Sequence, residues 1–279
     1  MNHRHDTWGW MLAVDFFFAG MGGAMICIAG LADLFYDKVG VSLLGNFLGP
    51  ICIGIGAGFL ILELGRPFQS WRVFVNPKAI LTFGAWNMLI AIVAGLLLAS
   101  FGLAQVPWQS AVALRKLLAV VSVITGLVVA TYPGVLLGRH KSRPFWVGPG
   151  LMSLFLLSSL VTGTAAHLLC GLTTTVTASI LPDIFRWVAA GLLVLQLALW
   201  VGYVLIKKTG TTYLEAKAAE RWLSGDLAGL FKYGFLLIGT IVPIILLIWS
   251  MNFAFLGSAL VLLGGLLMRW LAVCAGEDR

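Results

Sequence analysis

The sequence predicts an all-α integral membrane protein, a bundle of eight transmembrane helices with no soluble domain. Of its 279 residues, 60% are hydrophobic and only 10% are charged, whereas a soluble domain carries about 25% charged residues. Eight apolar stretches are each about 20 residues or longer, the length that crosses the hydrocarbon core of a bilayer as a helix. Most connections between them are short. Residues 1–279 are therefore expected to form a single polytopic membrane domain.

The eight predicted helices cover residues 10–36, 43–65, 79–103, 111–138, 146–168, 183–206, 229–250 and 253–275. The first is longer than the apolar region of a signal peptide, so we expect it to be retained. The second ends at Gly65 and Pro67, because glycine suits a helix exit and proline cannot continue a helix. The fourth contains Pro133, which kinks a helix and frees a carbonyl group. Only the sequence SMNF separates the last two, which indicates a tight hairpin. The charged loop 207–228 predicts an amphipathic helix around 212–223.

Basic residues are distributed unevenly between the two sides of the membrane. Eight spans place both termini on one side, and 14 of the 18 Lys and Arg residues, Arg269 among them, are assigned to that side. The opposite side has Lys38, Arg115, Lys116 and Arg186. The positive-inside rule therefore predicts that both termini lie in the cytoplasm. The net charge of +7 does not predict nucleic-acid binding, because no basic, aromatic-interleaved soluble segment exists.

Several kinds of active site are excluded or disfavoured. The four histidines are His3, His5, His140 and His167. His167 lies near the far end of the fifth helix and the others lie on the opposite side, so no pair can sandwich a haem iron. The four cysteines stand singly, which does not suggest a disulfide framework or a metal site. No GxSxG, HExxH or P-loop motif is present. We therefore expect no haem or metal in this chain and no catalysis by this chain alone on a soluble substrate.

Four polar residues on four different helices are predicted to share one layer near the membrane face that holds the termini. They are Asp15, Glu63, Asn87 and Tyr132. Ionisable groups inside a membrane span are costly and often functional. Each also has a structural interpretation: Glu63 can form an ion pair with Arg66 that closes the second helix, and Tyr132 can be an interfacial residue. In the other half of the bundle, Asp33, Asp37, Asp183 and Arg186 are interpreted as loop or helix-end groups.

A polar layer at modest depth, enclosed by apolar walls, suits an amphipathic ligand such as a quinol. Tyr132 or Asn87 can bind a quinone oxygen, and Asp15 or Glu63 can accept the released proton. One alternative is a secondary transporter or permease that uses Asp15 and Glu63 as coupling carboxylates. Transporters commonly contain internal repeats with broken helices near mid-membrane, and no such repeat is evident in this sequence. A second alternative is a purely structural anchor that tethers a complex.

Five ordered motifs in the first 170 residues resemble the membrane subunits of the NrfD/polysulfide reductase family, which are related to the dimethyl-sulfoxide reductase anchor. They are FFFAGMGGAMICIAGL, LELGRP, NPKAILTFGAWNM, YPGVLLG and RPFW. The resemblance implies a haem-free, eight-helix subunit of the prokaryotic cytoplasmic membrane. Such a subunit exchanges electrons between menaquinone or ubiquinone and a four-cluster ferredoxin-like iron–sulfur subunit. That partner serves a molybdopterin oxidoreductase or, in some relatives, a multihaem cytochrome.

The resemblance also implies where the quinone and the partner bind. The family's quinone pocket uses a polar side chain of the first helix and the tyrosine of the fourth, which match Asp15 and Tyr132. The pocket lies near the face where the iron–sulfur subunit docks, and the docking or charge-partner residues expected on that face are Arg66, Arg72, Arg139 and His140. Well-known relatives dock their partner outside the cytoplasm. The basic residues here predict a cytoplasmic site face instead.

Overall fold

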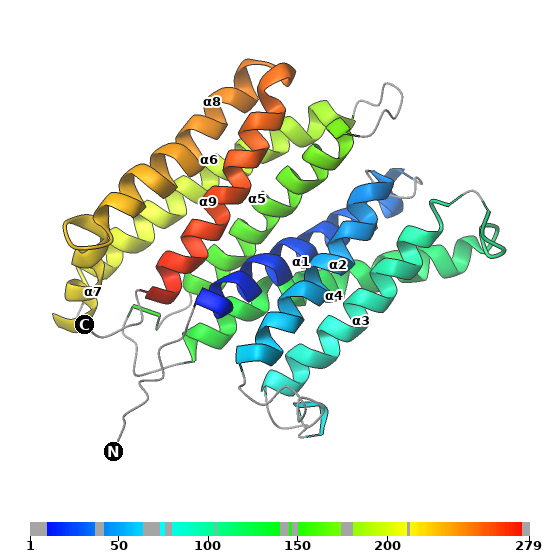
Figure 1. Cartoon of the computed structure of the whole chain (residues 1–279), viewed down its shortest axis with the longest axis horizontal. Coiled ribbons are helices and arrows are strands. Elements are labelled where there is room, and N and C mark those ends of the chain that lie inside the picture. The colour runs from blue at the N-terminus through cyan, green and yellow to red at the C-terminus, as the bar shows by residue number, and fades with distance from the viewer. Residues whose placement is uncertain are drawn as a thin grey trace.

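The computed structural model shows a bundle of long helices that run roughly antiparallel to one another (Figure 1). The structure describes residues 10–36, 42–63, 73–75, 80–103, 105–139, 145–146, 150–173, 181–210 and 213–274. Within these ranges, eight helical stretches are long and apolar enough to cross a membrane. The predicted fold class is confirmed, and the chain is a multi-pass membrane protein.

The helices follow the predicted spans closely. Their bounds are α1 Trp10–Tyr36, α2 Leu43–Glu63, α3 Ile80–Ser100, α4 Val112–Gly138, α5 Gly150–Thr173, α6 Leu181–Lys208, α7 Tyr213–Leu223, η2 Leu230–Ile241, α8 Val242–Trp249, η3 Met251–Phe253 and α9 Ala254–Cys274. The seventh predicted span consists of η2, a π-helix, followed by α8. The hydroxyl of Thr240 donates to the carbonyl of Phe235, five residues earlier, at 3.0 Å. The predicted hairpin turn contains the short 3₁₀ helix η3.

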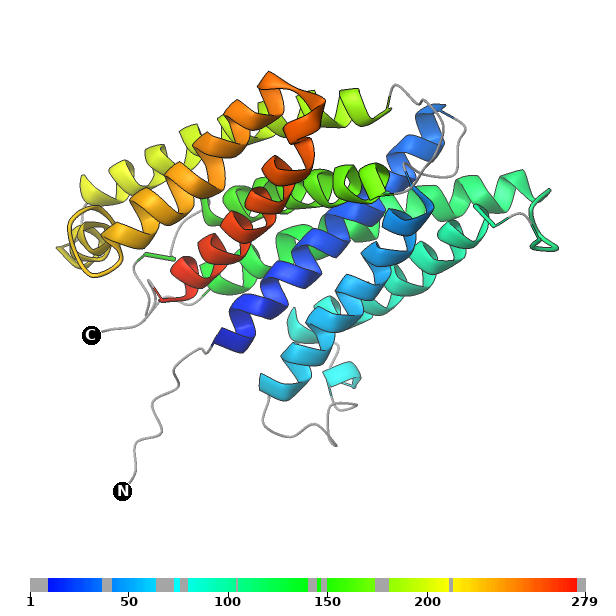
Figure 2. The same cartoon turned by 45° about the horizontal axis from the view of Figure 1, so that its top comes forward.

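The helices form two groups that meet at α1 and α5. Helices α1 to α4 pack together, and α5, α6, η2, α8 and α9 form the second group. Helix α1 contacts α5 and α9 across the junction, and Figure 2 shows α1 and α9 side by side. Helices α1 and α5 are buried over most of their length, whereas the other six spans expose a larger share of their residues. This arrangement explains why α1 is apolar all round rather than amphipathic.

Close backbone approach allows α1 to occupy the centre of its group. A Cβ atom added at Gly23 would lie 2.8 Å from the carbonyl oxygen of Gly126 in α4. A Cβ added at Gly22 would lie 2.5 Å from the carbonyl oxygen of Gly49 in α2. Small residues at such crossings let membrane helices gain van der Waals contact that apolar burial alone does not provide in lipid. The glycine-rich sequence of α1 therefore positions α2 and α4 around it.

Helix α7 is the amphipathic helix predicted in the charged loop. It packs against α6 and η2, and its Trp222 ring is buried and stacks on Trp200 of α6 with the ring centroids 5.4 Å apart. The Nζ atom of Lys207 donates to Glu215 at 2.8 Å, which adds an ion pair between α6 and α7. The ring stack and the ion pair fix α7 at the end of the second helix group.

Candidate functional site

Asp15 is the most unusual polar residue of the first helix group. It lies five residues into α1, its exposed fraction is 0%, and neither carboxyl oxygen has a hydrogen-bond partner within the described ranges. A buried polar group without a partner costs free energy, and an ionisable one inside a membrane costs more. The position of Asp15 therefore calls for a ligand, a proton or a water molecule that satisfies the carboxyl group.

Tyr132 of α4 and Glu63 of α2 belong to the same neighbourhood. The carboxyl group of Asp15 is close enough to interact electrostatically with Glu63 and with the phenol of Tyr132. The Tyr132 side chain is buried, and its hydroxyl has no hydrogen-bond partner among the described residues. Glu63 is the last residue of α2 and is exposed. The structure thus combines two buried polar groups with an exposed carboxylate at the helix end.

The ring of Tyr132 is held against α3 at a position without a side chain. A Cβ atom added at Gly84 would lie 2.6 Å from Cε2 and 2.7 Å from Cζ of the tyrosine. Tyr132 also precedes Pro133, the proline inside α4, and it belongs to an apolar cluster with Ala19 and Met88. The phenol therefore has a defined place between α1, α3 and α4, which the sequence does not indicate.

Asn87 differs from the other three residues of the predicted layer. It lies on α3, one turn after Gly84, and its side chain is partly exposed. Its Nδ2 atom donates to the carbonyl oxygen of Phe83 in the same helix at 3.0 Å. That hydrogen bond satisfies part of the amide locally, which a sequence interpretation based on depth alone does not reveal. The structure brings Asp15, Glu63 and Tyr132 together, whereas the Asn87 amide bonds within its own helix.

The structure describes only one of the four predicted docking residues. Arg66, Arg72 and His140 lie outside the residues that the structure describes, and so does any pairing of Glu63 with Arg66. Arg139 follows the last residue of α4, is exposed, and its backbone N–H bonds to the carbonyl of Leu137. This places a cation at the membrane face where α2 ends and α1 begins.

One residue of the predicted basic face lies elsewhere. The sequence assigns Arg269 to the side of the termini, but it lies inside α9 with an exposed fraction of 0%. Its guanidinium donates to oxygen atoms of α1, α5 and α9. The prediction is wrong because it assumes that a long side chain near a helix end reaches water, whereas this one turns into the bundle. Its apolar neighbours in LLGGLLMRWLAVC are the available signal.

The other half of the bundle also contains buried polar groups, contrary to the prediction. Asp33 of α1 is fully buried, with its carboxyl oxygens 3.3 Å from Nε of Arg115 and 3.9 Å from Nζ of Lys116. His167 of α5 is fully buried, and its Nε2 bonds to the carbonyl of Met25 at 2.9 Å. Because a carbonyl only accepts, this contact places the proton on Nε2. The error comes from treating helix-end residues as solvated when neighbouring helices cover them.

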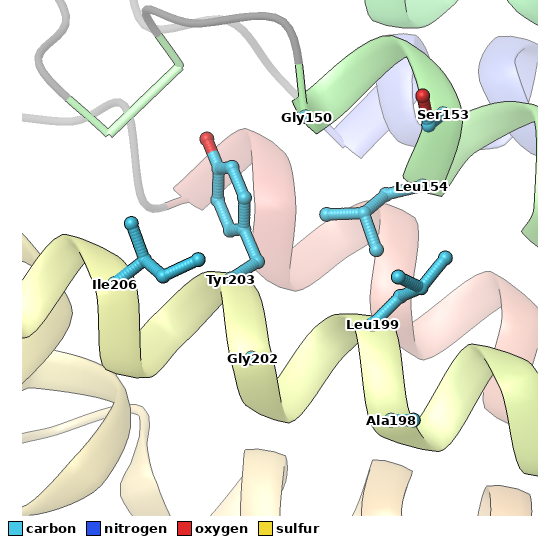
Figure 3. A pocket seen from close by; sticks show the side chains of 8 residues that line it. All are labelled: Gly150, Ser153, Leu154, Ala198, Leu199, Gly202, Tyr203 and Ile206. Carbon is cyan, nitrogen blue, oxygen red and sulfur yellow. The ribbon is translucent and has the colours of Figure 1, made fainter.

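A cleft of about 280 Å³ opens between α5 and α6 (Figure 3). Gly150 and Ser153 of α5 and Gly202 and Tyr203 of α6 are among its lining residues. The Tyr203 hydroxyl already donates to the carbonyl of Phe145. The cleft is apolar, and none of its lining residues belongs to α1–α4. It is therefore separate from the group around Asp15.

The group around Asp15 can form two complementary kinds of hydrogen bond with the polar head of a ligand. An ionised carboxylate only accepts hydrogen bonds, whereas a phenol hydroxyl both donates and accepts. Asp15 can accept a hydrogen bond and then a proton, and Tyr132 can donate to an oxygen atom of the same ligand. Apolar side chains around the tyrosine suit the hydrophobic part of such a ligand. The orphaned oxygen atoms of Asp15 and Tyr132 therefore fit a hydroxylated, amphipathic ring.

Comparison with known proteins gives the same family over the whole sequence. The family model described as "Polysulphide reductase, NrfD" matches residues 1–278. One of the polypeptides of the polysulfide reductase of Wolinella succinogenes is 27% identical, over 97% of this chain and 94% of its own length. Protein NrfD of Escherichia coli is 24% identical, over 58% of this chain and 59% of its own length. The resemblance seen in the helix-end motifs thus extends to the C-terminal half, and the chain belongs to the NrfD family of polysulphide reductase membrane proteins.

Proposed function

We propose that this chain is a quinone-reactive membrane subunit of a respiratory oxidoreductase complex. The observation that carries the proposal is the pair of buried polar groups, Asp15 and Tyr132, whose oxygen atoms lack partners among the described residues. A quinol is amphipathic, dissolves in the bilayer, and presents hydroxyl groups that can satisfy these atoms. Membership of a family whose named relatives include a polysulfide reductase polypeptide supports an oxidoreductase complex.

In the proposed reaction, a quinol loses two electrons and two protons and becomes a quinone. Tyr132 binds one ring oxygen and fixes the orientation of the ring, and Asp15 accepts the two protons one after the other. Glu63, exposed at the end of α2, receives each proton from Asp15 and releases it to water, so that Asp15 is free to accept the second. Asn87 contributes a polar side chain from α3. The two electrons leave to the iron–sulfur partner, since the proposed function assigns no haem or metal to this chain.

The proposed partner is a four-cluster ferredoxin-like subunit that serves a molybdopterin oxidoreductase or a multihaem cytochrome. It would dock on the face where α1 begins and α2 and α4 end, because electron transfer requires a short path from the quinol. Arg66, Arg72, Arg139 and His140 are proposed to make the docking contacts. Their positive charge suits an acidic surface on the partner and favours fast association. The quinone is proposed to be menaquinone or ubiquinone.

Equilibrium binding of a quinol-analogue inhibitor tests the proposal directly on the purified protein in detergent. We expect a fluorescent hydroxyquinoline-N-oxide to bind at one saturable site, with menadiol or decylubiquinol competing for it. Binding should weaken by on the order of tenfold in Asp15→Asn and Tyr132→Phe variants, which is the loss of about one hydrogen bond to a charged or buried group. Binding that neither quinol displaces would contradict the proposed function.

The proposed orientation of the protein in the membrane gives a second testable result. We propose that both termini and the site face lie in the cytoplasm, because most Lys and Arg residues are assigned to that side even after Arg269 is removed from the count. A fluorescent protein that matures only in the cytoplasm should fluoresce when it is fused after Arg279. Alkaline phosphatase fused at the same position should be inactive. The reverse pattern would place the site outside the cytoplasm, as in the well-known relatives.

A further inference from the structure

Arg269 is a cation buried at the junction of the two helix groups, and the proposed reaction does not use it. It lies on α9, and its exposed fraction is 0%. Its guanidinium carbon is 5.5 Å from the centroid of the Phe17 ring, which is within the range of a cation–π contact. Arginine inside a membrane is costly and usually has a defined task. The position of Arg269 therefore needs an explanation.

The guanidinium is held by four hydrogen bonds to neutral oxygen atoms. Nε donates to the carbonyl of Phe16 in α1 at 2.9 Å, and Nη2 donates to the hydroxyl of Ser159 in α5 at 3.0 Å. Nη1 donates to the hydroxyl of Ser158 and to the carbonyl of Gly265, both at 3.1 Å. None of the ion pairs found in the described part of the chain includes Arg269. One side chain thus connects α1, α5 and α9 without a carboxylate.

Helix α1 is shaped to receive this guanidinium. A Cβ atom added at Gly20 would lie 3.0 Å from Nη2 of Arg269 and 2.6 Å from Oγ of Ser159. Alanine at position 20 would therefore push the guanidinium and the serine away from α1. Apolar residues of similar volume would often stabilise a fold as well as a buried charge does. Gly20, Ser158 and Ser159 all surround Arg269, which indicates that the contact between the guanidinium and α1 has a role of its own.

The contact with α1 lies at the turn that carries Asp15. Phe16 is the next residue of the helix, and neighbouring side chains on a helix point about 100° apart. Within the described residues Arg269 forms no hydrogen bond or ion pair with Asp15, so it holds the backbone at this turn instead of touching the carboxyl group. Fixing Phe16 sets both the rotation of α1 and the depth of Asp15 relative to Tyr132. Misplacing a reacting group by about 1 Å can cost on the order of 100-fold in rate.

We propose that Arg269 is a positioning residue of the quinol site, one that fixes the turn of α1 on which Asp15 stands. This inference rests on the proposed function and adds the second helix group to the site. Helices α1 to α4 supply the groups that contact the ligand, and α9 supplies the side chain that aligns one of them. Changes in the packing of α9 against α1 would then alter turnover without altering any residue that contacts the quinol.

Variants at position 269 test the proposal in the intact complex. Arg269→Met should lower kcat for menadiol oxidation by on the order of 100-fold per assembled complex and weaken inhibitor binding by about tenfold. Arg269→Lys keeps a donor and the charge but not the forked geometry, so it should recover about tenfold of the lost kcat. A purely structural clamp would change the amount of assembled complex and leave kcat per complex, and its recovery by lysine, unaffected. That outcome would overturn the inference.

Gly20→Ala tests the same contact while keeping Arg269, in case Arg269→Met does not accumulate. It should lower kcat by about tenfold or more, because the added methyl group moves the guanidinium from Phe16. Gly191→Ala on α6 is the matched control, since no atom lies within 4 Å of a Cβ added there. Equal turnover in the two alanine variants would refute the positioning role. If the wild-type protein binds inhibitor and Asp15→Asn abolishes turnover, the proposed function stands whatever Arg269 and Gly20 variants show.

Discussion

Replacing Asp15 with asparagine is expected to reduce quinol oxidation by the intact complex by on the order of 10²- to 10⁴-fold, the usual contribution of a positioned general base. Asparagine keeps the size and polarity of the side chain, but it cannot accept the proton that the quinol must lose. The carboxyl group has no hydrogen-bond partner in the described residues, so the variant leaves no internal partner unsatisfied. Steady-state oxidation of menadiol, coupled to reduction of the partner's iron–sulfur clusters, measures the effect.

Asp183→Asn is the matched control for this variant. Asp183 lies at the start of α6, its side chain is 65% exposed, and it pairs with Arg186 at 3.3 Å within the same helix. An ion pair whose carboxylate is exposed contributes little to stability, and Asp183 lies at the opposite end of the bundle from Asp15. Asp183→Asn should therefore keep wild-type turnover. Full turnover in Asp15→Asn would mean that another group takes the proton, and the assignment of Asp15 would be wrong.

Tyr132→Phe is expected to separate activity from stability. The variant should lower kcat/KM for menadiol by on the order of 10- to 100-fold, because a hydrogen bond to the ring oxygen and its orienting effect are lost. The free energy of unfolding should stay equal or rise by about 1 kcal/mol, because the buried hydroxyl has no partner among the described residues. Kinetics of the complex and thermal unfolding of the protein in detergent measure the two effects.

Tyr203→Phe provides a control with the opposite pattern. The Tyr203 hydroxyl donates to the carbonyl of Phe145, so phenylalanine leaves a buried carbonyl without that donor. Stability should fall by about 1–2 kcal/mol, while kcat/KM stays at the wild-type value, because Tyr203 lies on α6 beside the cleft between α5 and α6 and its hydroxyl is already bonded to Phe145. A drop in stability for Tyr132→Phe would show that its hydroxyl has a structural partner, and the quinol assignment would lose its main support.

The fold could be predicted almost completely from the sequence, because the bilayer imposes simple rules on it. Every backbone group inside the hydrocarbon must be bonded within the protein, so each long apolar stretch becomes a helix. The ends of α1 and α2 lie within two residues of the predicted positions. The π-helix η2 could not be predicted, because it has the same apolar composition as an α-helix. Its backbone hydrogen bonds distinguish it, such as the bond from the N–H of Val242 to the carbonyl of Leu237, five residues earlier.

Only those features of the candidate site that follow from the depth of a residue along its helix could be predicted from the sequence. Asp15 and Tyr132 both lie near the same membrane face, and the structure places them close enough to interact electrostatically. Asn87 has a suitable depth, but its side chain is partly exposed and its amide bonds to Phe83 in the same helix, which depth along the helix does not indicate. Arg269 escapes prediction for a related reason. Its role depends on α1 and α5, which are more than a hundred residues away in sequence.

The central position of α1 has a consequence for how the protein is made. Asp33 lies on α1, which is synthesised before α4, the helix that carries its partners Arg115 and Lys116. At a synthesis rate of about 5–20 residues per second, this carboxylate precedes its cations by roughly 4–16 s. During that interval the Asp33 carboxylate lacks the two cations that lie beside it in the folded protein. We therefore expect Asp33 to stay protonated or hydrated until α4 arrives, so that α1 reaches its final place in the bilayer only after later helices are made.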